Sequence, residues 1–418
     1  MENSIKQDYY RAAFDIGMQI SRDAIWFEDQ CNWLTASMEH ESQHPKVYYK
    51  SMDSSFYGGT IGIAFFLNSL SRYTDEPLIK KTAIGAIKHA LSAKDKVPEA
   101  ARLGFFTGWT GLIFTLLQFE ETDKNGQWHP YIKPLLDDIL KIDYRHSGID
   151  IIDGIAGAIP ALIHICQKDK NQFLKPFIIT IGDHLMSIAK KEKIGISWET
   201  MKGTKHNLTG YAHGSSGFIH AFIELYAFTN DKKYLDMAFE GQIYENSHFV
   251  KTQNNWPDFR DLEGFSINGQ ENTTHDVQCS CAWCHGAPGI GLARLRAYQI
   301  TKNKSFLDDA LLAIQTTKEQ IILQPEAGFS LCHGLFGNAE LLTMGYNILG
   351  DTSLNETVSD IGHFAIKESY KKDKPLTNGI GNGFLIPDFM TGTSGMGYQY
   401  LRFFDEGNLM SPLLICSS

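Results

Sequence analysis

The stretch Trp283-Cys284-His285-Gly286-Ala287-Pro288-Gly289-Ile290-Gly291 joins a cysteine, a histidine and a Gly-x-x-Gly turn in one short run. The pattern Cys-His-Gly-x-x-Gly occurs again in Cys332-His333-Gly334-Leu335-Phe336-Gly337. A shorter part of it, His-Gly-x-x-Gly, occurs earlier in the chain in His213-Gly214-Ser215-Ser216-Gly217. Thiol and imidazole groups are good ligands for soft and borderline metal ions. Their repeated placement beside the same turn therefore predicts a metal site carried by a repeat scaffold.

The Gly-x-x-Gly turn recurs along the chain at intervals of roughly 50 to 70 residues, which is a strong signal of an internal repeat. The first glycines of the seven turns are Gly59, Gly108, Gly154, Gly214, Gly286, Gly334 and Gly392. Most turns precede an apolar run, such as 112–117 or 218–223, and a more amphipathic segment with lysines, such as 77–93 or 305–322, lies between turns. One buried and one half-exposed helix form a hairpin that must stack on its neighbours to cover its apolar face.

Seven stacked hairpins can make either an open solenoid or a closed ring, and we expect the ring. The predicted fold is all-α: a double-layered α/α toroid of seven helical-hairpin repeats. The runs that follow the turns are apolar nearly all round, as an inner wall covered on both sides should be. The glycines are expected to supply positive φ angles and to let neighbouring inner helices start close together.

The whole chain, 1–418, is expected to be one toroid domain, with a first helix at 7–30. Two intervals between turns hold extra material. Short strands are expected there at 194–200 and 247–252, with a turn at 267–270. These segments are interpreted as small β-containing insertions over one rim, at about 190–210 and 240–278.

Composition limits the choice of partners and compartment. Of 418 residues, 43% are hydrophobic and 21% are charged, which predicts a large core and no disordered chain. A net charge of −10 argues against nucleic acid or an anionic membrane as the main partner. There is no apolar run of ~18 residues, so no membrane span is expected. The seven cysteines of this long chain fit a reducing cytoplasm, where clustered cysteines more often bind metal than form disulfides.

The polar candidates line up when they are counted from the first glycine of each turn. Two positions before it stand Cys284 and Cys332; one position before it stand His213, His285, His333 and Asp153; four before it stands Asp150. The equivalent places in other repeats hold Tyr57, Gly58, Phe106, Thr107, Met390 and Thr391. If the repeats close into a ring, these places share one rim. Residues as distant in sequence as Asp150 and His333 would then face a common centre.

Zinc suits Cys284, Cys332 and His333. Two thiolates and one imidazole leave one tetrahedral position open, which is the pattern of a catalytic rather than a structural zinc. The open position can take water or a substrate thiol, and a thiol bound there is deprotonated near neutral pH and becomes a nucleophile. His213 suits a proton shuttle, and Asp150 suits a partner that holds the imidazole in one tautomer. The alternative for His213 is a rim histidine bonded to a backbone carbonyl.

Several neighbouring residues allow other interpretations. His285 as a fourth ligand would close the coordination shell. Cys279 and Cys281 form a Cys-x-Cys-x-x-Cys run with Cys284 and are alternative ligands, although they precede the turn by more residues. Asp153, directly before its turn, fits a helix N-cap. The remaining cysteines have no partner motif and are expected to be packing residues: Cys31, Cys166 and Cys416.

Together, the seven glycine turns and the motifs Trp283-Cys284-His285-Gly286, Cys332-His333-Gly334 and Ala212-His213-Gly214 resemble the lanthionine synthetase C-like family, which includes the bacterial lanthipeptide (lantibiotic) cyclases. The resemblance covers about 55–403. It implies an α/α toroid with a central zinc held by Cys284, Cys332 and His333, an acid/base histidine at His213 and an active-site aspartate at Asp150. The implied activity adds peptide cysteine thiols to dehydroalanine or dehydrobutyrine, which forms the thioether rings lanthionine and methyllanthionine.

The chain departs from this family pattern at two positions. Ser280 stands four before Cys284, where stand-alone cyclases carry an arginine, and His285 stands where they often carry a tyrosine. The run 283–289 looks more like the cyclase portion of fused dehydratase–cyclase enzymes, or like the eukaryotic relatives. A chain of 418 residues leaves no room for a dehydratase domain, so a separate dehydratase is expected to act first. The roles of these two positions stay open.

The resemblance also implies partners and rival functions. A dehydrated precursor peptide is the expected substrate, with its leader on the inserted segments. A dehydratase and an exporter are expected in a biosynthetic complex, either in the cytoplasm or held at the membrane through that complex. One rival is an enzyme that adds glutathione to dehydroamino acids. The other is a non-enzymatic zinc scaffold, which predicts a closed coordination shell.

Overall fold

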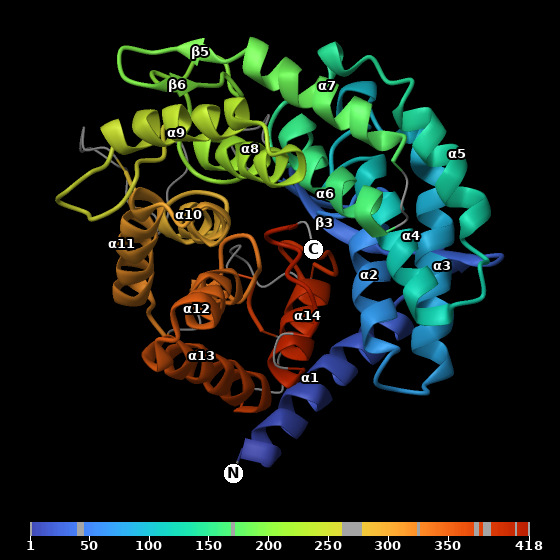
Figure 1. Cartoon of the computed structure of the whole chain (residues 1–418). Helices are drawn as coiled ribbons and strands as arrows, with labels where there is room; N and C mark the ends of the chain where they lie inside the picture. Colours follow the sequence, from blue (N-terminus) through green and yellow to red (C-terminus); the bar gives the residue numbers. More distant parts are fainter. Residues whose placement is uncertain are drawn as a thin grey trace.

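Two concentric layers of helices form a closed ring in the computed structural model of the chain (Figure 1). The structure describes residues 2–39, 46–168, 172–260, 278–323, 327–371, 376–378, 386–405 and 408–416. The inner layer consists of α2 (Thr60–Leu70), α4 (Trp109–Asp123), α6 (Ile155–Lys168), α8 (Ser215–Thr229), α10 (Ala287–Thr301), α12 (Leu335–Leu349) and α14 (Thr393–Phe404). The outer layer consists of α3 (Pro77–Ala93), α5 (His129–Ile139), α7 (Leu174–Ser187), α9 (Lys232–Ser247), α11 (Lys304–Gln320), α13 (Thr352–Lys371) and α1 (Glu2–Arg22). The α/α toroid predicted from the sequence is confirmed.

The first helix of the chain closes the ring against the last one. α1 packs on α14 and so becomes its outer partner, while α14 also lies beside α2 (Figure 1). Tyr9 of α1 contacts the rings of Tyr400 and Phe403 of α14, with centroids 6.2 and 5.4 Å apart. Aromatic pairs at such distances add stability beyond the area that they bury. The seventh hairpin is therefore assembled from the two ends of the chain.

The inner wall is apolar all round because both of its sides are covered. Every residue of α2 is buried. On the inside of the ring, Phe56 packs against Phe389 with ring centroids 5.0 Å apart. The C-terminal segment 408–416 fills more of this space: Trp283 donates a hydrogen bond through Nε1 to the carbonyl of Leu413 over 2.9 Å. The centre of the ring is thus a packed core below the rim.

Three inner helices, α8, α10 and α12, are joined to the outer helices that follow them by the same two-residue connection. The inner helix ends at a residue in the left-handed conformation, and the next residue caps the outer helix by accepting the N–H two positions on. The left-handed residues are Asn230, Lys302 and Gly350, and the caps that follow them are Asp231, Asn303 and Asp351. A left-handed residue ends a helix, and an Asx side chain starts the next, so the chain reverses within two residues.

The glycine turns are required by close approach rather than by positive φ. The second glycine of each turn lies in the first turn of an inner helix, and an added Cβ would overlap a carbonyl oxygen three residues before the first glycine. The oxygens concerned belong to Phe56, Phe105, Ile151, Tyr211, Trp283, Leu331 and Phe389. Of the seven first glycines, all within the described residues, Gly286 alone has a positive φ, +95°. The expectation of positive φ was therefore wrong for the other six, whose backbone any residue could adopt.

Replacing Gly286 with Ala is expected to lower the free energy of unfolding by about 2 kcal/mol or more. The new Cβ would meet the carbonyl oxygen of Ser280 at a backbone that side chains rarely adopt. Gly58→Ala is the matched control, because Gly58 stands directly before the first glycine of another turn and a Cβ there would find no atom within 4 Å. Urea unfolding of both variants checks this. Equal stability of Gly286→Ala and wild type would contradict the clash.

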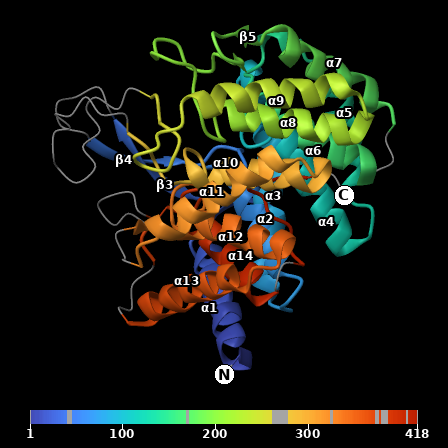
Figure 2. The ribbon, with the colours of Figure 1, turned by 60° about the vertical axis from the view of Figure 1, so that its left-hand side comes forward.

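Short strands lie outside the helical layers. β1 (Ile25–Phe27) pairs with β2 (Gln30–Asn32), β3 (Leu34–Glu39) with β4 (Lys46–Ser51), and β5 (Lys190–Lys191) with β6 (Ile196–Ser197), all antiparallel. Figure 2 shows β3 and β4 projecting to one side of the helices. The helix predicted over 7–30 is wrong at its end, because α1 stops at Arg22 and Ile25 begins a strand. The strands β3 and β4 were not predicted, although the run Val47-Tyr48-Tyr49 in β4 is rich in residues that favour strands.

The two predicted insertions have mixed outcomes. The strand expected at 194–200 is present as β6, whereas 247–252 forms the end of α9 and one isolated bridge between Val250 and Asn255. The turn expected at 267–270 lies outside the described residues. The division into one domain, 1–418, with insertions at about 190–210 and 240–278 stays a prediction. Within the described part of the chain, no helix has the length and apolar character needed to cross a membrane.

Candidate metal centre

Residues two positions before the first glycines meet around one rim of the ring, joined by backbone hydrogen bonds from repeat to repeat. The N–H of Ala212 donates to the carbonyl of Cys284 (3.1 Å), and the N–H of Cys284 donates to that of Cys332 (3.3 Å). Cys332 in turn donates to Met390 (2.9 Å), and Met390 donates to Tyr57 of the first repeat (3.0 Å). This backbone ring explains why residues far apart in sequence share one centre.

Three donor groups from two of these turns lie together. The ligand atoms of Cys284, Cys332 and His333 are all within 4.8 Å of one another. Cys332 is buried, Cys284 is half-buried and His333 is exposed, so the group is open on one side. Among the described residues this group does not include His285, Cys279 or Cys281.

The chemistry of this donor set fits a metal ion. A hydrogen bond from Cys332 lowers the pKa of the Cys284 thiol well below its ordinary value, and the same bond raises the pKa of Cys332 well above its own. One of the two sulfurs is therefore held as a thiolate, the form that binds metal. Two sulfurs and an imidazole suit a soft or borderline ion.

Tyr57 supports the cluster from the equivalent position of the first repeat. Its hydroxyl donates to Cys332 Sγ over 3.0 Å. Burial, followed by the charge of Cys332, raises the pKa of Tyr57 well above its ordinary value, so the hydroxyl keeps its proton. Sequence reasoning recorded the position of Tyr57 but gave it no role, because a phenol is not a usual ligand for zinc. A donor to a ligand sulfur tunes both its charge and its orientation.

Tyr57→Phe is expected to weaken zinc binding about 10- to 100-fold, because the sulfur loses its hydrogen bond. The measurement is a competition titration with a coloured zinc chelator. Tyr131→Phe is the control, since Tyr131 lies exposed on α5. Equal zinc affinity of Tyr57→Phe and wild type would remove Tyr57 from the site.

His213 and Asp150 form a hydrogen-bonded pair beside the cluster. Nδ1 of His213 lies 2.5 Å from Oδ2 of Asp150, and their side chains are 33% and 10% exposed. Burial lowers the pKa of His213, but the hydrogen bond and the charge of Asp150 outweigh it, so the net shift is upward. Asp150 Oδ1 also accepts from the N–H groups of Ile152 and Asp153 (3.0 and 3.1 Å). Asp150 thus holds the backbone of the turn that leads into α6, while the expectation that Asp153 caps this helix stays a prediction.

The loop that carries His213 is fastened at both ends by one buried carboxylate. Glu245 of α9 accepts from the N–H of Gly210 (2.9 Å) and from the N–H of Ser216 (3.2 Å). Arg294 of α10, fully buried, pairs with the same carboxylate over 2.5 Å. A paired and saturated buried charge of this kind holds a backbone in one arrangement. The position of His213 is therefore set by the packing of α8, α9 and α10.

His285 packs beside His213 and reaches toward a second ion pair. The two imidazole centroids are 5.9 Å apart, and His285 is 1% exposed. Neither ring nitrogen of His285 has a hydrogen-bond partner among the described residues. Its Nδ1 lies 3.8 Å from Oδ1 of Asp258, and Asp258 pairs with Arg260 over 2.6 Å. Asp258 and Arg260 were missed in the sequence because they lie between α9 and α10, away from the glycine turns from which the candidate positions were counted.

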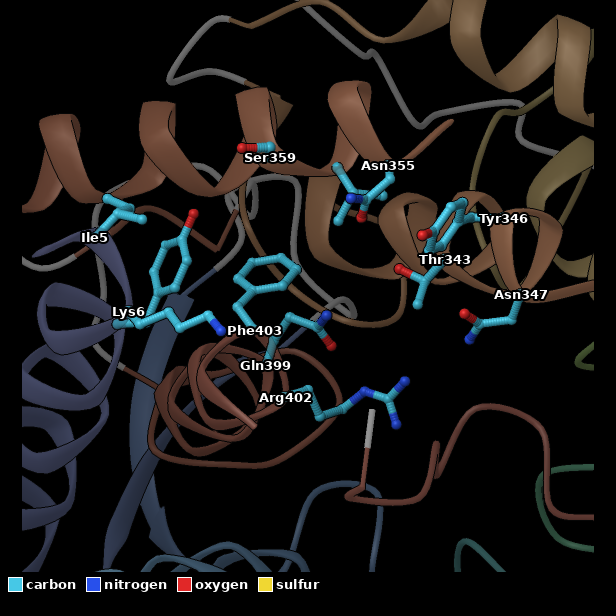
Figure 3. A pocket seen from close by; sticks show the side chains of 12 residues that line it. Ile5, Lys6, Thr343, Tyr346, Asn347, Asn355, Ser359, Gln399, Arg402 and Phe403 are labelled. Carbon is cyan, nitrogen blue, oxygen red and sulfur yellow. The ribbon is translucent and has the colours of Figure 1, made fainter. Parts of the chain in front are cut away.

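Two cavities lie at some distance from the cluster. One, of about 420 Å³, includes Thr107 and Asp153 in its lining and so opens on the same rim. The other, of about 380 Å³, lies between α1, α12, α13 and α14 (Figure 3). Its lining is largely polar and includes Gln399, whose Oε1 has no hydrogen-bond partner among the described residues. A polar space of this size holds several waters, and it contains no member of the metal cluster.

A helical ring that gathers two thiols and an imidazole on one rim, beside a histidine–aspartate pair, defines a toroid protein with a group of residues that could hold a soft metal ion. The chain belongs to the family described as lanthionine synthetase C-like protein, whose family model matches residues 50–414.

Individual relatives show how far the similarity extends. The lacticin 481/lactococcin biosynthesis protein LcnDR2 of Lactococcus lactis subsp. lactis is 27% identical over 400 residues, which are 93% of this chain and 39% of that protein. The glutathione S-transferase LANCL1 of Danio rerio is 33% identical over 69 residues, 16% of each chain. The solved structure of nisin cyclase shares the fold, with a TM-score of 0.65 and 17% identity, and covers 85% of this chain and 89% of that one. The chain therefore spans well under half the length of the first of these relatives.

Proposed function

We propose that the chain is a zinc-dependent lanthipeptide cyclase, which adds peptide cysteine thiols to dehydroalanine or dehydrobutyrine and so forms thioether rings. The observation that carries the proposal is the meeting of Cys284, Cys332 and His333 within 4.8 Å. Family membership and the similarity to a lacticin biosynthesis protein support it. A dehydrated precursor peptide is the proposed substrate.

The three donor residues would hold the zinc ion, with His333 on the open side of the group. When bound, zinc supplies the acidity that makes a coordinated substrate thiol a thiolate near neutral pH. Cys284 and Cys332, being half-buried and buried, keep their sulfurs in place for the ion. Tyr57 holds one of them by its hydrogen bond.

His213 acts as the general acid of the proposed reaction. The addition forms a C–S bond at the alkene β-carbon and a C–H bond at the α-carbon, while the S–H bond and the π bond of the alkene are lost. The thiol proton leaves to water, and His213 gives its proton to the α-carbon. Asp150 accepts from Nδ1 of the ring, so Nε2 is the nitrogen left for the substrate. No oxidant or reductant is required.

A mass assay tests the proposal directly. Dehydrated precursor peptide is incubated with zinc-loaded protein, and the products are treated with a thiol-alkylating reagent. Ring formation protects each cysteine from alkylation, while the mass of the peptide itself stays unchanged. Full alkylation after incubation with stoichiometrically zinc-loaded protein would contradict the proposed activity.

The second candidate is addition of glutathione to dehydroamino acids, which the local similarity to LANCL1 favours. The same dehydrated peptide, incubated with glutathione and without a free cysteine of its own, separates the two. A mass increase of one glutathione per alkene would favour the second candidate. A third candidate, a zinc scaffold without catalysis, predicts a cobalt spectrum that added thiol does not change.

Partners and compartment follow from the proposed activity. Dehydration must precede ring closure, so a dehydratase acts before this protein, and an exporter in the same complex would take up the product. The leader of the precursor is proposed to bind the inserted segments at about 190–210 and 240–278. We place the reaction in the cytoplasm, where precursor peptides are made and thiols stay reduced.

A further inference from the structure

We propose that Arg260 binds the carbonyl oxygen of the dehydroamino acid and stabilises the negative charge that develops there when the thiol adds. The inference rests on the proposed cyclase function and names a residue that the sequence motifs do not contain. Arg260 would thus act as an oxyanion-binding catalytic residue, supplied by an insertion rather than by a repeat.

The guanidinium of Arg260 is held rigidly by Asp258. Nε donates to Oδ1 over 3.0 Å and Nη2 donates to Oδ2 over 2.6 Å, while the backbone N–H of Arg260 also donates to Oδ1 over 3.1 Å. The Asp258 side chain is 1% exposed, whereas that of Arg260 is 30% exposed. Two-point pairing fixes the plane of a guanidinium. These bonds use Nε and Nη2, and Nη1 is the nitrogen proposed to donate to a substrate oxygen.

Two hydrogen bonds join this pair to the segment that leads to Cys284, and His285, which follows Cys284, lies beside the pair. The N–H of Asp258 donates to the carbonyl of Gln278 over 2.8 Å. The hydroxyl of Ser280 lies 3.4 Å from Oδ2 of Asp258, and Nδ1 of His285 lies 3.8 Å from Oδ1. Ser280 and His285 are the two positions at which the chain departs from the pattern of stand-alone cyclases. Both departures therefore converge on the carboxylate that positions Arg260.

The electrostatics of the site agree with this placement. Burial lowers the pKa of Arg260, but the hydrogen bond and charge of Asp258 raise it, followed by the charges of Cys284 and Cys332. The guanidinium therefore lies within electrostatic reach of both cluster sulfurs. Arginine stays protonated at every working pH, unlike the nearby imidazoles. It is thus a permanent positive charge beside the place where a substrate thiol would bind.

The reaction needs such a charge. When the thiolate attacks the β-carbon, the electron pair of the alkene moves toward the carbonyl, and the oxygen becomes an enolate oxygen until the α-carbon is protonated. That oxygen is three bonds from the carbon under attack, so its partner must lie close to the sulfurs. A fixed donor aimed at a developing oxyanion is worth about 100- to 1000-fold in rate. Arg260 meets the requirements of charge and rigidity, and its partner Asp258 lies near Ser280 and His285, which stand before and after Cys284 in the chain.

The test compares Arg260→Gln with Arg145→Gln in the full chain. Asp143 and Arg145 form the same Asp-x-Arg pair, with Nε and Nη2 donating over 2.7 and 2.8 Å, but on an exposed surface. Arg260→Gln is expected to lower kcat for ring formation about 100-fold with a smaller change in KM, and Arg145→Gln to leave both unchanged. The absorption spectrum of the cobalt-substituted Arg260→Gln protein should match that of wild type, whereas its unfolding temperature should fall because the buried carboxylate of Asp258 loses its charged partner.

Distinct outcomes overturn the inference. If Arg260→Gln cyclises at the wild-type rate, the residue does not act in the reaction. If it loses the cobalt spectrum together with activity, Arg260 is structural. If Arg260→Gln fails to fold, Arg260→Lys is tested in its place, because lysine keeps the charge but lacks the planar pair of N–H donors. Arg260→Lys is expected to lose about tenfold in kcat. An unchanged kcat overturns the inference. If zinc-loaded wild type itself leaves the thiols alkylatable, the proposed function fails, and this inference fails with it.

Discussion

Cys284→Ala protein is expected to purify with less than a tenth of the wild-type zinc and to lose more than about 1000-fold in the rate of ring formation. The reason is that a site of two sulfurs and one imidazole cannot lose a sulfur and still bind zinc tightly. The lost thiol is also the one whose pKa the hydrogen bond from Cys332 lowers. Zinc is measured by mass spectrometry of the purified protein, and the rate by the alkylation assay.

Cys279→Ala is the matched control for this variant. Cys279 lies five positions from Cys284, is half-buried, and is outside the group of donor atoms. Cys279→Ala should therefore keep its zinc and its rate. Full zinc content in Cys284→Ala, or loss of zinc in Cys279→Ala, would show that the ligands have been misassigned.

The fold could be predicted from the sequence because the repeat carries most of the information. The second glycine of every turn faces a carbonyl oxygen at the same offset, so the spacing of Gly286 and Gly289 reports a packing constraint that each hairpin obeys. The hairpins β1–β2 and β3–β4 were missed since they belong to no repeat. The end of α1 was misplaced because the aromatic residues after Arg22 fit either a helix face or a strand.

The grouping of the site residues could be predicted only for residues that stand at equivalent positions relative to the glycine turns. Counting from the glycines placed Cys284, Cys332 and His333 near one another, because the backbone ring at the rim joins equivalent positions. Their roles, like those of His213 and Asp150, stay predictions. A residue far from any glycine turn has no equivalent position in the other repeats, so the position of Arg260 could not be predicted in this way. Only the three-dimensional structure places Asp258, the partner of Arg260, beside Ser280 and His285 on either side of Cys284.

His213→Asn is expected to lower kcat for ring formation about 100- to 10,000-fold while zinc content stays at the wild-type level. Asparagine retains a hydrogen-bonding side chain of similar reach, but it cannot give a proton to the α-carbon. The measurement combines the alkylation assay with zinc analysis of the same sample. His146→Asn is the control, because His146 is exposed and lies outside the site. A His213→Asn enzyme with full activity would exclude His213 as the general acid.

The pH dependence of Asp150→Asn then tests how His213 is kept protonated. A general acid works only in its protonated form, so the rate falls as the pH rises through the pKa of His213. Burial lowers that pKa, and in the wild type the hydrogen bond and charge of Asp150 outweigh burial and raise it. Without the carboxylate, only the smaller effects of the charges of Asp153 and Cys284 oppose burial, so the fall in rate should move to lower pH in Asp150→Asn. The wild type should keep its rate to a higher pH, and coincident profiles would show that Asp150 does not set the protonation of His213.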